Sequence, residues 1–288
     1  MQHEVIIVGG GLAGITAALE LLDQGKRVAL LDRGPKERFG GLARWAMGGI
    51  FYVDSPFQRK AKIQDSPEKA YRDWLSYAEF GAGDEWPRRW AEQYVSRCTP
   101  EVYEWLKPKG IKYIPSVQWI ERGLHQPGNS VPRFHVVWGT GQALADQLID
   151  ALWRHPNRKR LELFFRQDVE DLLLREGRVI GVRGHQLDGG AAFEIEAETV
   201  IIAAGGITGD VKVVRKHWDP AWGEAPNDLL TGSHLVANGD IHRIVESHGA
   251  QLSNLHHQWN YAAGVHHPDA DHAQHGLSLV PPKTALWV

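Results

Sequence analysis

Gly9-Gly10-Gly11-Leu12-Ala13-Gly14 is the stretch that says most about the fold of this chain. Residues 4–8 before it are a short apolar run, which predicts a buried parallel strand. Residues 13–24 after it carry apolar side chains on one helical face and end at Gly25, which predicts a helix. Residues 27–32 (RVALLD) predict a second buried strand. A G-x-G-x-x-G motif on the turn between a strand and a helix is the context that identifies a dinucleotide-binding α/β fold.

The residues of this turn have separate tasks. Gly9 permits the tight turn, Gly11 lets the backbone approach a pyrophosphate, and Gly14 lets the helix pack closely on the sheet. Leu12 and Ala13 begin the helix, whose free N–H groups and positive dipole end favour phosphate. These five residues are the predicted pyrophosphate site.

A carboxylate closes the second strand. Asp32 lies eighteen positions after Gly14, where it can accept hydrogen bonds from a ribose diol. Because the same carboxylate repels a 2′-phosphate, NADP is disfavoured at this site. Arg33 follows directly and is assigned to the same cofactor site. The glycine motif and Asp32 alone do not separate NAD from FAD.

The composition excludes several classes of partner. The 288 residues are 43% apolar and 23% charged, and a net charge of −3 gives no electrostatic reason to expect nucleic acid or an anionic membrane. Cys98 is the single cysteine, which rules out an internal disulfide framework. The start lacks the cationic region of a signal peptide, and Glu20 and the glycines interrupt the apolar residues 5–22. We therefore expect a soluble cytoplasmic protein that acts on a small-molecule substrate.

Helical patterns fill the middle of the chain. Ser66 and Thr99 each precede a proline, which predicts that their hydroxyls cap helices. The predicted helices cover residues 67–77, 85–98, 100–106 and 141–154. Six tryptophans lie between residues 67 and 140, and we expect them to pack in the core rather than stack on a ligand. They are Trp74, Trp86, Trp90, Trp105, Trp119 and Trp138.

Strand-like segments follow the last of these helices. They cover residues 161–165, 169–175, 179–184, 193–197 and 200–203. The turn residues Glu176-Gly177 and Asp188-Gly189-Gly190 predict an antiparallel meander among them.

The C-terminal part is rich in histidine, but a metal site is not expected there. The histidines do not have the i, i+4 helical pairing of a zinc site, and no cysteine accompanies them. They are His256, His257, His266, His267, His272 and His275.

Four further stretches carry a resemblance to known flavoproteins. The first is residues 40–50 (GGLARWAMGGI), and the second is the turn Ala203-Ala204-Gly205-Gly206. The third is Asn238-Gly239-Asp240, which opens a helix ending at Gly249. The fourth comprises Ser55-Pro56, Asp65-Ser66 and residues 129–141 (NSVPRFHVVWGTG). Together they resemble the superfamily of fumarate reductase, succinate dehydrogenase and 3-ketosteroid dehydrogenase flavoproteins, and most of all its members near the ketosteroid enzymes.

The resemblance implies a Rossmann-type, glutathione-reductase-like FAD-binding domain with an inserted meander and an inserted helical segment. It implies that residues 40–50 wrap the flavin and that the backbone near Val169 contacts the adenine. The cofactor-binding residues implied in this way are Gly40, Gly41, Leu42, Ala43, Met47, Gly48, Gly49, Val169, Ala204, Gly205 and Asp240.

Two departures from the superfamily pattern are informative. Leu42 occupies the position at which covalent members attach FAD through a histidine, so FAD is expected to bind non-covalently. Tyr261 occupies the position of a histidine that contacts substrate in dicarboxylate reductases, which argues against succinate or fumarate. Tyr261 is the candidate catalytic residue, as a hydrogen-bond donor or an acid–base group for a ketone, while simple packing of its ring is an equal alternative.

The resemblance also implies that the chain is an N-terminal portion. Residues 1–265 are expected to form the FAD-binding domain, and residues 266–288 the start of a truncated substrate-capping domain. One hypothesis is an FAD-dependent dehydrogenase that moves hydride between flavin N5 and a carbon next to a carbonyl, with a steroid-like or other apolar ketone as substrate. The other is a catalytically incomplete FAD-binding remnant, or one half of a split flavoprotein with a separately encoded C-terminal half.

Overall fold

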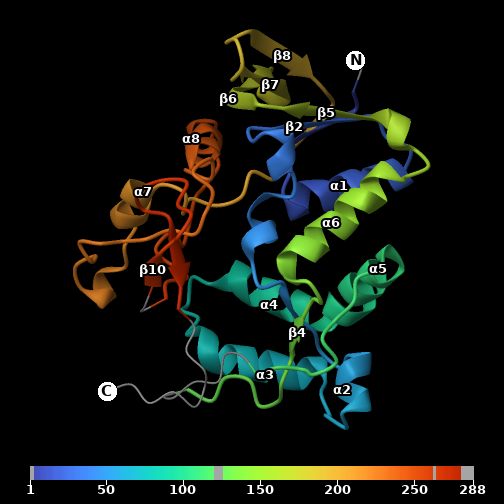
Figure 1. The fold of residues 1–288 in the computed structure, drawn as a ribbon, viewed down its shortest axis with the longest axis vertical. Coiled ribbons are helices and arrows are strands. Elements are labelled where there is room, and N and C mark those ends of the chain that lie inside the picture. Colours follow the sequence, from blue (N-terminus) through green and yellow to red (C-terminus); the bar gives the residue numbers. More distant parts are fainter. Residues whose placement is uncertain (1–2, 120–125, 262–263, 280–288) are drawn as a thin grey trace. The chain divides into compact units, whose positions relative to one another are not determined.

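The computed structural model describes residues 3–119, 126–261 and 264–279 (Figure 1). The chain divides into two compact units. The first combines residues 1–42 with residues 152–288, and the second consists of residues 43–151. The second unit is therefore an insertion between two parts of the first.

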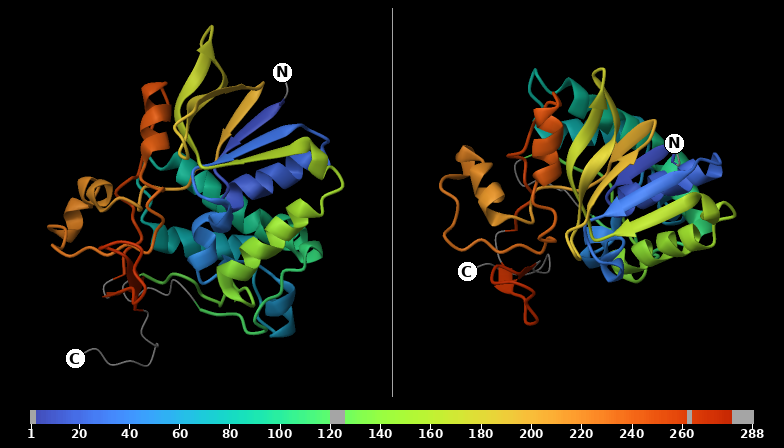
Figure 2. Two further views of the ribbon diagram at one scale, coloured as in Figure 1. Left: turned by 45° about the horizontal axis from the view of Figure 1, so that its top comes forward. Right: turned by 90° about the horizontal axis from the view of Figure 1, so that it is seen from above.

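A parallel sheet forms the centre of the first unit (Figure 2). Its strands, in spatial order, are β5 (Leu161–Phe165), β2 (Val28–Asp32), β1 (Val5–Val8) and β9 (Thr199–Ile202). Every residue of β1 is buried, as expected of a central parallel strand. Val8 lies opposite Leu31 on one side and Ile202 on the other, so the carboxyl ends of three strands meet at one edge. The predicted α/β class with a parallel sheet is confirmed.

Helix α1 (Leu12–Asp23) follows the glycine turn as predicted. Ile15, Leu19 and Leu22 form its buried stripe. Gly25 has a φ of +72°, a left-handed conformation that glycine adopts without strain and that ends the helix.

The antiparallel meander is also present. It consists of β6 (Gln167–Arg175), β7 (Arg178–Gln186) and β8 (Ala192–Glu196), joined at the predicted turns. The outer two of the five predicted strand segments belong instead to the parallel sheet, as β5 and β9. The meander and helix α8 (Asp240–Ser247) pack against the sheet around one core. The buried members of this core are Ile6, Val8, Ala29, Leu31, Val169, Leu172, Val182 and Ala197.

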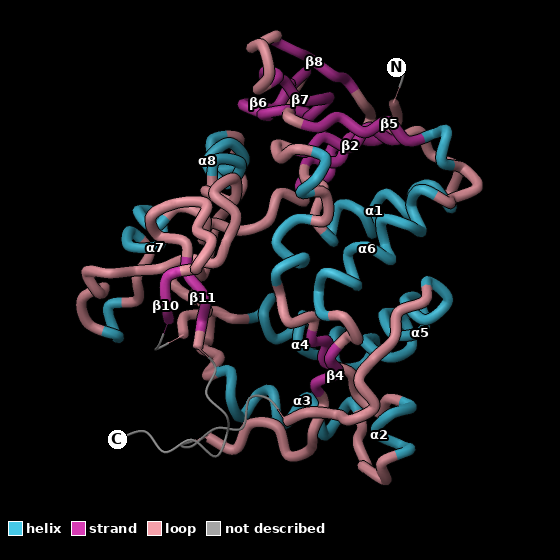
Figure 3. Tube along the Cα trace, in the orientation of Figure 1, coloured by secondary structure: helices cyan, strands magenta, loops and turns pink. Residues whose placement is uncertain are grey.

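Loops make up much of the remainder of the first unit (Figure 3). The short helical turns are η1 (Lys36–Arg38), η5 (Arg158–Arg160), α7 (Val211–Lys216) and η6 (Pro220–Trp222), and η2 (Gly41–Trp45) leads into the second unit. Strands β10 (Gly264–His266) and β11 (Gly276–Ser278) pair antiparallel. None of the helices in the described part of the chain combines the length and apolarity of a membrane span.

The second unit is mainly helical and contains one two-stranded ribbon. The ribbon pairs β3 (Gly49–Phe51) with β4 (Phe134–Val136). The helical elements are α2 (Pro56–Lys60), α3 (Pro67–Ala78), α4 (Glu85–Arg97), the π-helical turn η3 (Cys98–Tyr103), α5 (Glu104–Leu106), η4 (Lys107–Lys109) and α6 (Thr140–Trp153).

One of the two predicted helix caps in this unit is wrong. The Ser66 hydroxyl accepts a hydrogen bond from the Lys69 backbone N at 3.2 Å, so Ser66 caps α3 as predicted. Thr99 does not begin a helix, because helical structure continues from α4 through η3 into α5. Its hydroxyl donates instead to the carbonyl of Val53 at 2.5 Å.

The prediction that the tryptophans pack in the core is wrong for three of the six. Trp74 packs edge-on against Phe51, with ring centroids 5.6 Å apart. Trp86 and Trp90, one helical turn apart on α4, are 67% and 72% exposed, and Trp138 is also exposed. The Arg89 guanidinium lies over the Trp86 ring at 4.9 Å, a cation–π contact on this exposed face of α4.

Candidate functional site

The glycine turn has the geometry that a pyrophosphate site requires. A Cβ on Gly9 would lie 2.4 Å from the Ala203 carbonyl oxygen, and one on Gly14 would lie 1.9 Å from the Gly9 carbonyl oxygen. These positions therefore accept only glycine. A Cβ on Gly11 would meet no described atom within 4 Å, so the Gly11 backbone faces open space at the start of α1. Leu12 and Ala13 form the first turn of this helix, next to that space.

Backbone amides orient the carboxylate of Asp32. Oδ2 accepts from Gly10 N at 2.5 Å, and Oδ1 accepts from Gly34 N at 2.7 Å. Burial raises the pKa of Asp32, and the two amides oppose that shift. Each carboxylate oxygen has a second lone pair, so the fixed carboxylate can accept further hydrogen bonds from a diol.

A pocket lies at the edge of the first unit where the carboxyl ends of β1 and β2 meet. Ligands of open parallel sheets bind at this edge. The predicted residues that line it are Gly9, Asp32, Arg33, Val169, Ala204 and Asp240. The other described lining residues are Val8, Leu31, Gln167, Asp168, Gly206, Val236, Asn238, Gly239 and Ile241. The structure thus brings together residues that the sequence predicted from five separate stretches.

Arg33 forms ion pairs with two carboxylates that line this pocket. Its Nε lies 3.0 Å from Asp168 Oδ1, and its Nη1 donates to Asp240 Oδ2 at 2.8 Å. Asn238 Oδ1 accepts from the same Nη1 at 3.3 Å. Burial raises the pKa of Asp168, although Arg33 lies beside it and opposes this shift. Burial would also raise the pKa of Asp240, but hydrogen bonds from Arg33 and Asn238 help to outweigh it, so that this pKa is lowered. The pocket therefore holds one cation between two carboxylates.

Asp168 lines the pocket but was not predicted as a site residue from the sequence. Asp168 directly precedes Val169, which was assigned to the adenine through its backbone. The available signal was the position of this acidic residue at the start of a strand that packs on a core. A partly buried charge at such a position needs a partner of opposite charge.

Gly40 and Gly41 lie beside the glycine turn. Gly40 N donates to the Gly10 carbonyl at 2.9 Å, and a Cβ on Gly41 would lie 3.1 Å from Gly11 Cα. The first part of the predicted flavin-wrapping segment therefore follows the phosphate turn closely. Leu42 is 42% exposed and ends this part of the first unit.

The remaining predicted residues of that segment belong to the second unit. Ala43 is in η2, Met47 is exposed, and Gly48 and Gly49 lead into β3. Their assignment to the flavin stays a prediction.

Tyr261 and Gly205 are not among the described residues that line the pocket. Gly205 lies between Ala204 and Gly206, which do line it, and has a φ of +81°. Tyr261 is 50% exposed, and its ring lies 6.3 Å from that of Trp259. The catalytic role of Tyr261 stays a prediction.

Several of the C-terminal histidines stack on one another. His267 and His275 are parallel with centroids 4.2 Å apart, and His272 stacks on His275 at 5.2 Å. Within residues 3–119, 126–261 and 264–279, no group of histidine, cysteine, aspartate and glutamate has an arrangement that could hold a metal ion.

Curated relatives that are 38% identical to this chain are named KsdD-like steroid dehydrogenases. A KsdD-like steroid dehydrogenase of Mycolicibacterium smegmatis is 38% identical over 99% of this chain and 55% of its own length. One of Mycobacterium tuberculosis is 38% identical over 100% of this chain and 53% of its own length. The chain thus spans about half the length of these relatives.

Solved structures share the fold. The 3-ketosteroid-Δ4-(5α)-dehydrogenase of Rhodococcus jostii RHA1 superposes with a TM-score of 0.70 at 21% identity, covering 86% of this chain and 54% of that one. A flavocytochrome c3 fumarate reductase gives 0.71 at 22% identity, covering 86% of this chain and 41% of that one. The model of the family described as "FAD binding domain" matches residues 4–280, and the chain therefore belongs to this family, whose cofactor is FAD.

Proposed function

We propose that the chain is the FAD-binding part of an FAD-dependent oxidoreductase, with a Rossmann-type, glutathione-reductase-like fold. The observation that carries this proposal is the pocket at the carboxyl edge of the sheet. Gly9, the oriented carboxylate of Asp32, and Val169 line this pocket, and the open backbone of Gly11 and the first turn of α1 follow Gly9 in the chain. Asp32 suits a ribose, the glycine turn with the start of α1 suits a pyrophosphate, and the backbone near Val169 suits an adenine.

The residues of the first unit suit the ADP half of FAD. Gly11, Leu12 and Ala13 would present backbone N–H groups and the helix dipole to the pyrophosphate. Asp32 would accept from the ribose hydroxyls, and the backbone near Val169 would contact the adenine. Arg33 and Asp240 would border the nucleotide, while Ala204 and Gly205 would line the path toward the ring. FAD, when bound, supplies a two-electron acceptor for hydride.

The ring end of the cofactor rests on resemblance. Leu42, Ala43, Met47, Gly48 and Gly49 are the residues proposed to lie along the flavin. Because Leu42 has no nucleophilic atom, the proposed attachment is non-covalent. The proposed substrate is a steroid-like or other apolar ketone, which gives hydride to flavin N5 from a carbon next to the carbonyl while a base takes the neighbouring proton. The names and 38% identity of the relatives support this class.

Tyr261 is the proposed acid–base or hydrogen-bonding group for the ketone. Its exposed phenol is accessible to a molecule outside the described fold. We further propose that residues 1–265 form the FAD-binding domain and that residues 266–288 begin a substrate-capping domain.

A second candidate function is FAD binding without independent catalysis, as a remnant or one half of a split flavoprotein. Coverage of only about half of each relative supports it. Exposed apolar side chains toward the end of the described chain also support it, because a further polypeptide can cover them. These are Trp259, Tyr261, Val265, Leu277 and Leu279.

Anaerobic titration of the FAD-loaded chain with a 3-ketosteroid separates the two candidates. If the chain is a dehydrogenase, the oxidised flavin band is lost on titration, and it is lost more slowly in Tyr261→Phe. Fumarate, added afterwards as an electron acceptor, is not expected to restore the band. A band that persists with every ketone tested favours the FAD-binding half. The same titration with a purified C-terminal half of a relative then tests complementation.

A further inference from the structure

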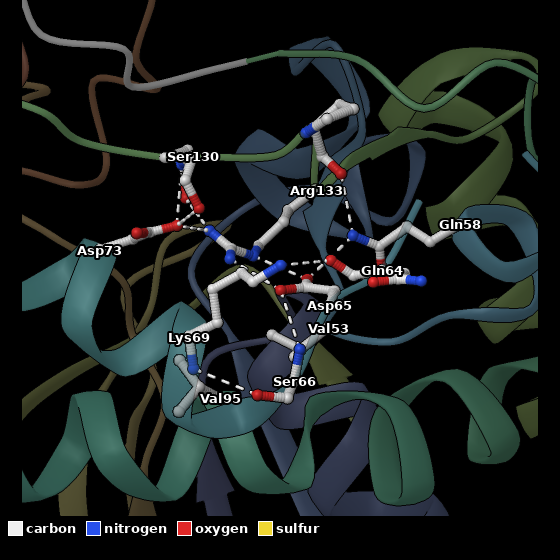
Figure 4. A network of polar contacts seen from close by, with 12 residues as sticks. Val53, Gln58, Gln64, Asp65, Ser66, Lys69, Asp73, Val95, Ser130 and Arg133 are labelled. Carbon is white, nitrogen blue, oxygen red and sulfur yellow. Dashed lines mark hydrogen bonds and ion pairs between the residues drawn. The ribbon is translucent and has the colours of Figure 1, made fainter. Parts of the chain in front are cut away.

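A buried polar cluster around Arg133 joins distant parts of the second unit (Figure 4). The Arg133 side chain is fully buried. Its Nε and Nη2 donate to the two carboxylate oxygens of Asp65, each at 2.7 Å. Its Nη1 donates to Asp73 Oδ2 and to Asn129 Oδ1, also at 2.7 Å. Asp73 Oδ2 accepts further hydrogen bonds from the backbone N and hydroxyl of Ser130. We call these five residues the Arg133 cluster.

The backbone of Arg133 is tied to the β3–β4 ribbon. Its carbonyl accepts from Tyr52 N at 3.0 Å, just beyond β3, and from His135 Nδ1 at 2.7 Å, within β4. Burial lowers the pKa of His135, which favours the neutral ring. Since Nδ1 then carries the proton, Nε2 accepts from the Ser55 hydroxyl at 2.7 Å. The side chain of Arg133 thus holds α3 and the loop at residues 129–130, and its main chain holds the ribbon.

The two strands of the ribbon and the start of α6 pack closely at Gly48 and Gly49. A Cβ on Gly49 would lie 1.5 Å from the Phe134 ring, next to Arg133 in sequence. A Cβ on Gly48, which has a φ of +74°, would lie 2.5 Å from Gly141 N. The backbone of Gly48 and Gly49 therefore follows the position of β4 closely.

We propose that Arg133 is a positioning residue for the bound flavin: through β4, it fixes the backbone of Gly48 and Gly49. This inference rests on the proposed function, which assigns these glycines to the cofactor. It also gives a role to Ser55, Asp65 and Asn129, which the sequence singled out in separate stretches.

The chemistry of the cluster suits positioning better than stabilisation. A bidentate arginine–carboxylate pair fixes the direction as well as the distance of both partners. A buried ion pair is weak evidence for stability, because well-packed apolar residues of similar volume often hold a fold equally well. A stabilising role and a positioning role therefore predict different behaviour when the charges are removed together.

Three variants of the full chain test the role. Arg133→Lys keeps the charge and removes the fork. The triple variant Asp65→Asn, Asp73→Asn, Arg133→Met removes every charge of the cluster and leaves no ion without a partner. Arg97→Lys is the matched control, because Arg97 pairs with Glu101 on the surface of the same unit. The measurements are the FAD dissociation constant, the visible circular dichroism of bound flavin, and thermal unfolding.

The positioning role predicts that both cluster variants fold but bind FAD about tenfold more weakly, as when a supporting contact behind a ligand-binding residue is removed. Their flavin dichroism changes, whereas Arg97→Lys matches the wild type. Wild-type affinity and dichroism in both cluster variants overturn the role. Loss of folding in both also overturns it, since the cluster then holds the fold itself. A wild-type chain that binds no FAD contradicts the proposed function instead, so the two failures are distinguishable.

Discussion

The guanidinium Nε of Arg33 lies 3.0 Å from Oδ1 of Asp168, which joins the end of β2 to the start of β6. The pair connects the parallel sheet to the meander at the rim of the pocket. Asp240 at the start of α8 binds the same guanidinium, so three elements share one cation. The charges of Arg33, Asp168 and Asp240 therefore hold three elements together at the rim of the pocket.

Replacing Arg33 with methionine is expected to destabilise the unliganded chain by about 1–2 kcal/mol. This is less than the loss for a fully buried pair, because the Arg33 side chain is 30% exposed. The remaining carboxylates also repel the pyrophosphate, so FAD affinity falls. Urea unfolding and FAD titration measure the two effects. Adding Asp168→Asn to Arg33→Met should recover part of both losses, and strictly additive effects would show that the pair does not interact.

Alanine substitutions at Gly11 and at Gly14 should have different effects, the first on FAD binding and the second on folding. A methyl group on Gly14 would lie 1.9 Å from the Gly9 carbonyl oxygen, so Gly14→Ala is expected to impair folding. A methyl group on Gly11 meets no described atom within 4 Å, so Gly11→Ala should fold normally but block the approach of the pyrophosphate. Circular dichroism and FAD titration separate the two outcomes. Normal FAD affinity in a folded Gly11→Ala would contradict the assigned phosphate site.

Acid should weaken the contact of α8 with the meander. Hydrogen bonds from His248 at 2.7 Å and Arg183 at 2.5 Å lower the pKa of Asp171 from 3.8 to about 2. A carboxyl with a depressed pKa contributes stability that is present above pH 3.8 and is lost as the pH falls toward 2. Urea unfolding across this window should show a smaller loss in Asp171→Asn than in the wild type. Glu198→Gln, at an exposed position before β9, serves as the control and should lose stability as the wild type does.

The sequence predicted the parallel sheet well and the long-range contacts poorly. Residues 4–32 follow local rules, since strand burial, the glycine turn and the helical stripe are each encoded within a few neighbouring residues. The partnership of Arg33 with Asp168 joins positions far apart in the chain, and nothing local specifies it. The same holds for Arg133, because Asp65 and Asn129 were visible as motif residues while their convergence depends on how α3 and β4 pack.

The tryptophans illustrate a different limit. An apolar side chain predicts burial only when the phase of its helix places it toward a neighbour. Trp74 on α3 meets Phe51, whereas Trp86 and Trp90 lie on an exposed face of α4. Residue type alone could not distinguish these cases.

This difference predicts unequal costs of removing the tryptophans. Trp74→Ala should lower the free energy of unfolding by about 3 kcal/mol, the lower end for loss of a packed indole, because Trp74 is only half-buried. Trp86→Ala and Trp90→Ala should each change it by no more than about 0.5 kcal/mol. Chemical denaturation of the three variants is the measurement. A large loss in Trp86→Ala would mean that its face of α4 is covered in solution.

The first unit is proposed to bind FAD through Asp32. The most direct measurement is FAD titration of the purified chain, read as the flavin absorbance retained after desalting, for the wild type and for Asp32→Ala. The wild type is expected to retain the flavin band. An affinity about 10- to 100-fold lower is expected in Asp32→Ala, since the lost hydrogen bonds to a charged acceptor are worth about 1.5–3 kcal/mol. Equal affinity in the two proteins, or no flavin retained by the wild type, would contradict this proposal.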